Sequence, residues 1–121
     1  MRSRFRKHGY AAIAAGLVLA AFAAPAHTAV TTHVTVKMTE YHFRLSVNHV
    51  RKGVVVFTIV NKGEIPHTFS IRSLDKTSPV IQAGKRYVMR VTFRKPGKYY
   101  YLCTVGAHEQ YGMFGNLRVT K

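Results

Sequence analysis

The sequence predicts an all-β protein of one domain, a sandwich or small barrel of seven to eight short strands. Apolar residues alternate with polar ones along most of the chain after residue 33, which is the pattern of strands with one buried face. Turn residues interrupt that pattern at regular intervals, and no stretch of ten residues shows a convincing helical period. The 121 residues fit one domain and leave little room for a second.

Each expected strand is supported by its own pattern. Alternation supports strands at 34–38, 41–47 and 87–93, and the run "VVVFTIV" at 54–60 is continuous enough for a strand buried on both faces. Turns at 52–53, 61–63, 83–84 and 95–97 carry glycine or proline and separate the strands. Shorter strands are expected at 67–71, 98–103 and 115–120, and "RSLDKTSP" at 72–79 is expected to be an exposed loop.

The N-terminal 26 residues have the features of an export signal. Four basic residues precede an apolar run of small residues from Ala11 to Ala24, and the "APA" at 24–26 suits a signal peptidase. The run is shorter than the roughly 20 residues that a membrane-spanning helix needs. We therefore expect a signal peptide at 1–26, a mature domain at 27–121 and a periplasmic or otherwise extracytoplasmic location. Retention of the segment as an uncleaved anchor is the alternative.

The chain is strongly basic, with 19 Lys and Arg against four Asp and Glu, a net charge of +15. The basic residues of the expected signal are Arg2, Arg4, Arg6 and Lys7, so the mature domain carries 15 − 4, or +11. These charges are scattered and accompany no nucleic-acid motif, and export also argues against a nucleic-acid partner. The electrostatic field of such a positively charged domain instead favours anionic partners.

Cys103 is the only cysteine, which is unusual for an exported chain, where cysteines normally pair as disulfides. It shares one strand face with Tyr99 and Tyr101, so it should point inward at the end of that strand. The loop that follows carries His108 and Met113 at five-residue spacings. Thiolate, imidazole and thioether are soft ligands that suit copper.

One further imidazole would complete a His₂Cys site with a weak axial methionine. His67 is the candidate, because it follows Pro66 and opens a strand directly after a turn, at an end of the sandwich.

Three segments together resemble the cupredoxins, the small type 1 blue copper fold: "VNKGEIPHTFSI", "PGKYYYLC" and "CTVGAHEQYGMFGNLRV". The resemblance covers essentially all of the mature domain. It implies a Greek-key β-sandwich and one mononuclear copper ion. The implied ligands, in chain order, are His67, Cys103, His108 and Met113. It also implies a carrier of single electrons between redox partners, not an enzyme.

Other functions fit the sequence less well. A non-redox copper chaperone or buffer is the alternative, although the Met-rich or His-rich clusters typical of such proteins are missing. A single cysteine excludes a binuclear centre with two bridging thiolates, and the paired His-x-His motifs of multicopper oxidases are absent from the sequence. An N-terminal His27 could chelate a second copper ion with His33, His42 or His49, or these histidines could bind nothing.

Two polar residues beside the ligands have open roles. In similar proteins the position of Thr68 contributes a hydrogen bond toward the cysteine, but a strand threonine facing solvent is an equal alternative. Asn61 could support the turn before His67 or merely form it.

The resemblance also implies where electrons leave. An apolar patch around His108 should meet the partner, an acidic cytochrome or oxidoreductase. The expected patch residues are Ile65, Pro66, Gly106, Ala107, Gly112 and Phe114.

Overall fold

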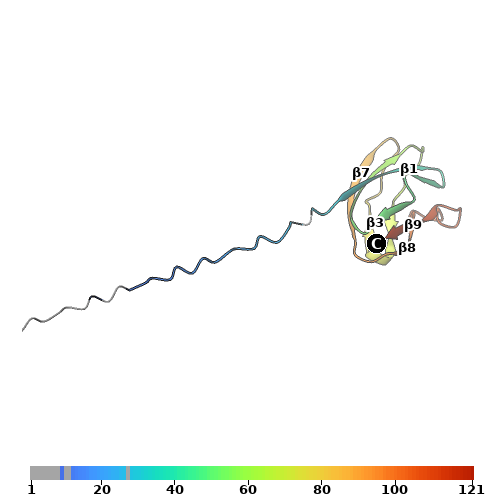
Figure 1. Cartoon of the computed structure of the whole chain (residues 1–121). Helices are drawn as coiled ribbons and strands as arrows, with labels where there is room; N and C mark the ends of the chain where they lie inside the picture. The colour runs from blue at the N-terminus through green and yellow to red at the C-terminus, as the bar shows by residue number, and fades with distance from the viewer. Residues whose placement is uncertain (1–8, 10–11, 27) are drawn as a thin grey trace, which may run out of the picture.

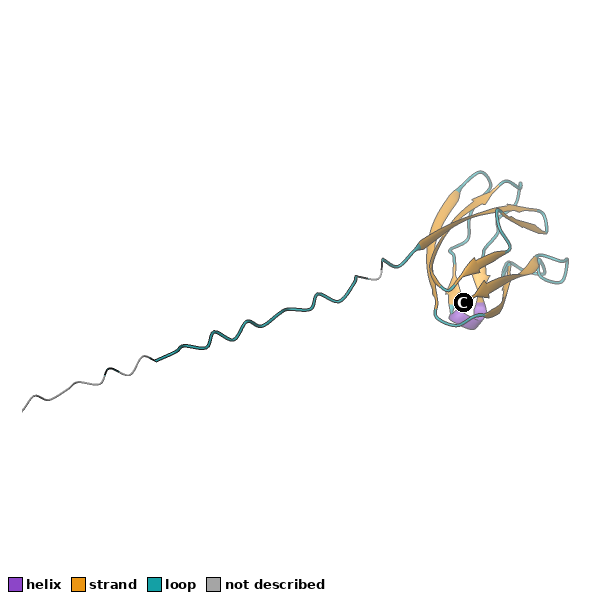
Figure 2. Ribbon diagram, in the orientation of Figure 1, coloured by secondary structure: helices purple, strands orange, loops and turns teal. Residues whose placement is uncertain are grey.

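Two β-sheets packed face to face form the domain (Figure 1). The computed structural model describes residue 9, residues 12–26 and residues 28–121. The basic residues of the expected signal and His27 lie outside the described residues. Strands dominate the domain, joined by loops and one short helical turn (Figure 2).

The first sheet has four strands in the order β2-β1-β4-β7. They are β1 (Thr31–Thr39), β2 (His42–Leu45), β4 (Gly53–Asn61) and β7 (Arg86–Phe93). β1 runs parallel to β4, and the other pairs are antiparallel. This arrangement requires the chain to leave the sheet after β2, to pass through β3 (His49–Arg51) in the second sheet and to return for β4.

The second sheet has five strands in the order β3-β9-β8-β5-β6. They are β3 (His49–Arg51), β9 (Phe114–Thr120), β8 (Gly97–Leu102), β5 (Ser70–Ile71) and β6 (Lys76–Thr77), with the 3-10 turn η1 (Arg72–Leu74) between the last two. β8 pairs antiparallel with β9, from Gly97 opposite Val119 to Leu102 opposite Phe114. The loop between these two strands therefore begins and ends at neighbouring positions.

The core lies between the sheets and is rich in aromatic rings. Phe69 is fully buried and contacts the rings of Phe43, Phe57 and Tyr101 at centroid distances of 5.5, 5.3 and 5.3 Å. Tyr101 is buried and Tyr99 partly buried on the inner face of β8, as the alternation predicts. Burying such rings provides much of the driving force for folding a domain of this size.

The predicted fold class is confirmed, and the strand count is nine within the described residues. The additional strands are short pieces that periodicity does not reveal. The expected exposed loop at 72–79 contains η1 and β6, and its Ser78 is buried. Ser78 is held by Phe69, whose amide donates to the Ser78 hydroxyl and whose carbonyl accepts from the Ser78 amide, both at 2.9 Å.

The expectation that residues 54–60 are buried on both faces is wrong. Val55, Phe57 and Ile59 face the core and are fully buried, whereas the even-numbered residues between them are only partly buried. Those residues belong to the outer face of the four-stranded sheet, where β-branched side chains are favoured without full burial.

Residues 12–26 extend away from the sandwich as one long stretch of chain without helix or strand (Figure 1). Ile13, Leu17 and Phe22 are 92%, 87% and 97% exposed, so they contribute nothing to the core. In the described part of the chain, no helix has the length and apolar character needed to cross a membrane. Signal cleavage after residue 26 stays a prediction.

Candidate metal centre

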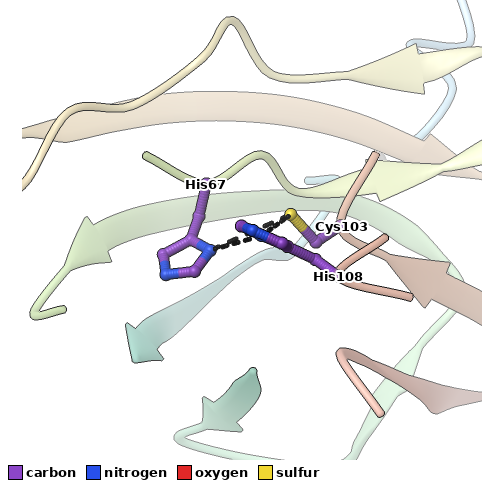
Figure 3. Close-up of side chains that lie close together, drawn as sticks. All are labelled: His67, Cys103 and His108. Carbon is purple, nitrogen blue, oxygen red and sulfur yellow. Dashed lines mark hydrogen bonds between the residues drawn. The ribbon is translucent and has the colours of Figure 1, made fainter. Parts of the chain in front are cut away.

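His67, Cys103 and His108 come together at one end of the sandwich (Figure 3). His67 pairs with Ile81 in an isolated bridge, with hydrogen bonds in both directions at 3.2 and 2.8 Å. Cys103 follows the last residue of β8, and His108 lies in the loop to β9. The three side chains therefore come from two loops at the strand ends.

The donor atoms of these residues form a compact triangle. His67 Nδ1 lies 3.2 Å from His108 Nδ1 and 4.0 Å from Cys103 Sγ, and Sγ lies 3.5 Å from His108 Nδ1. A triangle with these sides has a centre about 2.1 Å from each corner, which is close to the bond lengths of first-row metal ions to nitrogen and sulfur. The three residues thus fit one metal ion, which the two imidazoles and the cysteine sulfur could hold.

The burial of His108 favours its neutral imidazole, which is the form that binds metals. His67 is fully buried and His108 is 8% exposed. Burial lowers the pKa of His108 below its ordinary value, the charge of His67 acts in the same direction, and Glu40 opposes them. Water is largely kept from the donor atoms before any metal binds.

Thr68 is buried and bound to the cysteine, so the solvent-facing alternative is wrong. Its amide donates to Cys103 Sγ at 3.4 Å and its hydroxyl lies 3.8 Å from the same sulfur. The hydroxyl also accepts from the amide of Thr104 at 2.8 Å and lies 2.8 Å from that residue's hydroxyl. Hydrogen bonds of this kind orient a metal ligand.

The loop from Cys103 to Met113 is closed by its own backbone. The amide of Cys103 donates to the carbonyl of Met113, and the amide of Met113 donates to the carbonyl of His108, both at 3.0 Å. Met113 is fully buried, and its backbone hydrogen bond places it next to Cys103. The structure brings the fourth predicted residue next to the site, and its role as an axial ligand stays a proposal.

Asn61 supports the turn that leads to His67. Its side-chain amide donates to the carbonyls of Ile65 and Ile81 at 2.8 Å, and its side-chain oxygen accepts from the amide of Gly63 at 2.9 Å. The residue is fully buried with all these groups satisfied. Asn61 therefore holds both the residue that precedes Pro66 and the bridge partner of His67, so it does more than form the turn.

Glu40 is a site residue that sequence reasoning missed. It lies in the turn between β1 and β2, and its Oε1 is 3.1 Å from Nε2 of His67. The hydrogen bond from the amide of Ile65 lowers the pKa of Glu40, so the carboxylate is ionised at neutral pH. The available signal was weak: an acidic residue, one of four in a basic chain, at the junction of two expected strands.

The expected patch around His108 is accessible in part. Gly106, Ala107 and Gly112 are exposed, Phe114 is 49% exposed, and Ile65 and Pro66 are partly buried. Two tyrosines that were not predicted extend the aromatic surface: Tyr41 packs edge-on against His108 and Tyr111, with ring centroids 5.0 and 4.9 Å away.

Among the residues that the structure describes, this is the only group of three or more His, Cys, Asp and Glu side chains close enough to share a metal ion. His33, His42 and His49 are not part of it. A second copper site at His27 concerns a residue outside the described ranges.

A β-sandwich that gathers two imidazoles and one thiolate at a buried strand end defines a class, the mononuclear copper proteins of the type 1 kind. The family model described as "Cupredoxin-like domain" matches residues 12–117, and the chain belongs to that family. No curated protein matches the sequence.

Solved structures share the fold at low sequence identity. The dithionite-reduced auracyanin of Roseiflexus castenholzii aligns with a TM-score of 0.61 and 17% identity, over 77% of this chain and 99% of the auracyanin. A heme-copper terminal oxidase aligns at 0.64 and 20%, over 79% of this chain and 68% of the oxidase chain. The copper-containing nitrite reductase of Thermus scotoductus aligns at 0.56 and 21%, over 74% of this chain and 28% of the reductase. The shared property is the fold.

Proposed function

We propose that this protein is an exported electron carrier that holds one copper ion between His67, Cys103 and His108. The observation that carries the proposal is the buried triangle of two Nδ1 atoms and one Sγ atom, whose centre suits a single ion. A copper ion bound by such ligands supplies a one-electron Cu(I)/Cu(II) couple.

The chain contributes rigidity and exclusion of water. The bridge at Ile81 fixes His67, and the loop hydrogen bonds fix His108 and Cys103 relative to each other. Donor atoms that are already in place do not need to move when the charge at the site changes, which keeps the reorganisation on electron transfer small. The accessible groups around His108 give the shortest way from the site to a partner.

Titration of the purified protein with Cu(II) tests the proposal. We expect one equivalent to bind, to produce an intense blue colour and to bleach reversibly with ascorbate. Binding of copper with little colour, or without reversible bleaching, would instead support the chaperone or buffer function. Failure to bind copper at this site would refute both.

Met113 is proposed as the weak axial ligand, on the basis of its complete burial beside Cys103. The Met113→Gln variant should keep its copper and show a lower reduction potential, because an amide oxygen is a harder donor that favours Cu(II). Voltammetry and the visible spectrum measure this. An unchanged potential and spectrum would remove Met113 from the site.

The partner is proposed to be a redox protein with an acidic docking surface that meets the patch around His108. A charge of +11 on the expected mature domain would accelerate encounter with such a partner, while the exposed ring of Phe114 would contribute to the final complex. A brief redox encounter requires only a small interface.

Electron transfer to this partner should slow as salt rises, because screening at ~0.1 M already limits electrostatic reach to about 10 Å. Phe114→Glu should slow transfer further without changing the copper spectrum. Val88→Glu is the matched control, because Val88 is 55% exposed on the other sheet and receives the same charge away from the patch. Stopped-flow rates that do not respond to salt, or that respond equally to both variants, would contradict this docking mode.

Export through a cleaved signal at 1–26 belongs to the same proposal and places the carrier outside the cytoplasm. The mass of the protein recovered from the producing cells decides this. A chain that begins at His27 supports cleavage, and retention of residues 1–26 on a membrane fraction supports the anchor.

A further inference from the structure

The carboxylate of Glu40 lies on the outer side of the His67 ring. Oε1 of Glu40 is 3.1 Å from Nε2, while Nδ1 of the same ring faces Cys103 and His108. His67 is fully buried, whereas the Glu40 side chain is 34% exposed. The ring is therefore held between a carboxylate on one side and the donor triangle on the other.

This arrangement determines the tautomer of His67. A carboxylate accepts a proton donor, so Nε2 carries the hydrogen and Nδ1 keeps its lone pair toward the site. A carboxylate in this position also increases the basicity of the imidazole toward a metal. From the geometry we propose that Glu40 is a positioning residue for the copper site, one that sets the tautomer, orientation and donor strength of His67.

The turn at residues 63–65 is built around the same carboxylate. Oε1 of Glu40 also accepts from the amides of Glu64 and Ile65, at 2.9 and 3.2 Å. At Gly63, the three nearest atoms that an added Cβ would meet all belong to the Glu40 carboxylate, and the closest approach is a clash. Gly63 thus leaves the space that the Glu40 carboxylate occupies. The lack of a side chain at residue 63 is a second indication that the carboxylate has a specific position there.

The β1–β2 turn has the conformation needed to deliver this contact. Thr39 pairs with His42, so the turn consists of Glu40 and Tyr41 alone. Tyr41 has a φ of +55°, an uncommon conformation for a residue of this type that is found where surrounding contacts enforce it. Its ring packs against His108 while Glu40 reaches His67, so one two-residue turn contacts both histidines.

Five variants of the copper-loaded protein, one of them a double variant, test the role of Glu40, which rests on the proposed copper function. Glu40→Gln keeps an oxygen acceptor but removes the charge, so copper should stay bound while the reduction potential rises. Glu40→Ala removes both and should also weaken Cu(II) binding by about 10- to 100-fold, the usual cost of losing a partner of a metal-bound histidine. Glu64→Gln is the control: it removes the same charge from an exposed neighbour, and its potential should change less.

Gly63→Ala provides the sharpest comparison. If its added methyl group acts by displacing the carboxylate, it should reproduce the effect of Glu40→Ala and should have no further effect in the Glu40→Ala background. A Gly63→Ala effect that persists in that background would show that the methyl group does not act through the carboxylate. It would overturn the position assigned to the Glu40 carboxylate beside Gly63. If the reduction potentials of Glu40→Gln and Glu64→Gln both equal that of the wild type, Glu40 only stabilises the turn. That result would overturn the proposal.

A measurement without copper separates this inference from the proposed function. Nitrogen NMR of the apo protein should show His67 protonated at Nε2 in the wild type and a loss of that single tautomer in Glu40→Ala. If copper does not bind but the tautomer behaves as expected, the electron-carrier function fails and only the effect of Glu40 on the His67 ring stands. If copper binds and neither tautomer nor potential depends on Glu40, only the positioning role fails.

Discussion

Replacing Cys103 with serine is expected to abolish the intense blue colour of the copper-loaded protein and to leave the sandwich folded. The colour of a type 1 site depends on a copper–thiolate bond, and the serine hydroxyl is a hard donor that stays protonated at neutral pH. The visible spectrum after addition of Cu(II) measures the loss. An intense blue colour in the serine variant would show that the ligand assignment is wrong.

The same substitution should be mild for the fold. Cys103 is buried at 1% exposure, but its backbone amide keeps its hydrogen bond to the carbonyl of Met113, and the serine oxygen can still accept from the amide of Thr68. Thermal unfolding of the apo protein checks this. A variant that fails to fold would be replaced by Cys103→Ala, which fills similar space without a polar group.

Replacing Phe69 with alanine should cost the apo protein about 3–5 kcal/mol of its free energy of unfolding, as for other buried phenylalanines. The ring is fully buried among Phe43, Phe57 and Tyr101, which come from both sheets. Its removal leaves a cavity that this rigid aromatic cluster cannot readily close. Because domains of this size are stable by only about 5–15 kcal/mol, the loss is a large fraction of the total.

Urea unfolding of the apo protein measures the effect without the contribution of bound metal. Val88→Ala is the control, since Val88 is 55% exposed and its truncation should change the free energy of unfolding by no more than about 0.5 kcal/mol. Phe69 directly follows Thr68, so copper affinity should fall as well. A Phe69→Ala variant as stable as Val88→Ala would contradict the core described above.

The sequence was sufficient for features that depend on local order. The period-two alternation reflects the pleat of single strands, so it predicted the long strands β1, β4, β7, β8 and β9. Cys103, His108 and Met113 lie within one short loop, so their separation in sequence already limits how far apart they can lie in space. The place of His67 was predictable because a turn and Pro66 mark an end of the sandwich, but the strand expected to open at His67 begins only at Ser70, and His67 itself forms an isolated bridge with Ile81.

Contacts between distant segments depended on the tertiary structure. Glu40 reaches His67 across 27 residues of sequence, and Thr68 reaches Cys103 across 35. No periodicity records such pairs, because they follow from the packing of one sheet end against another. The strand β6 has two residues, too few for a pattern, and β5 covers only the last two residues of the strand expected at 67–71. Their extent is set by the neighbouring strands that pair with them.

The division between the two sources of information has a physical basis. Strand periodicity, turn chemistry and the order of soft ligands are properties of short stretches of chain, so the sequence alone was enough to predict an all-β domain with a candidate copper site. Other features depend on how distant segments pack in space: the tautomer of His67, the hydrogen bonds to the Cys103 sulfur and the position of the Glu40 carboxylate beside Gly63. They became determined only when the β1–β2 turn, the 61–65 turn and the loop after β8 met at one end of the sandwich.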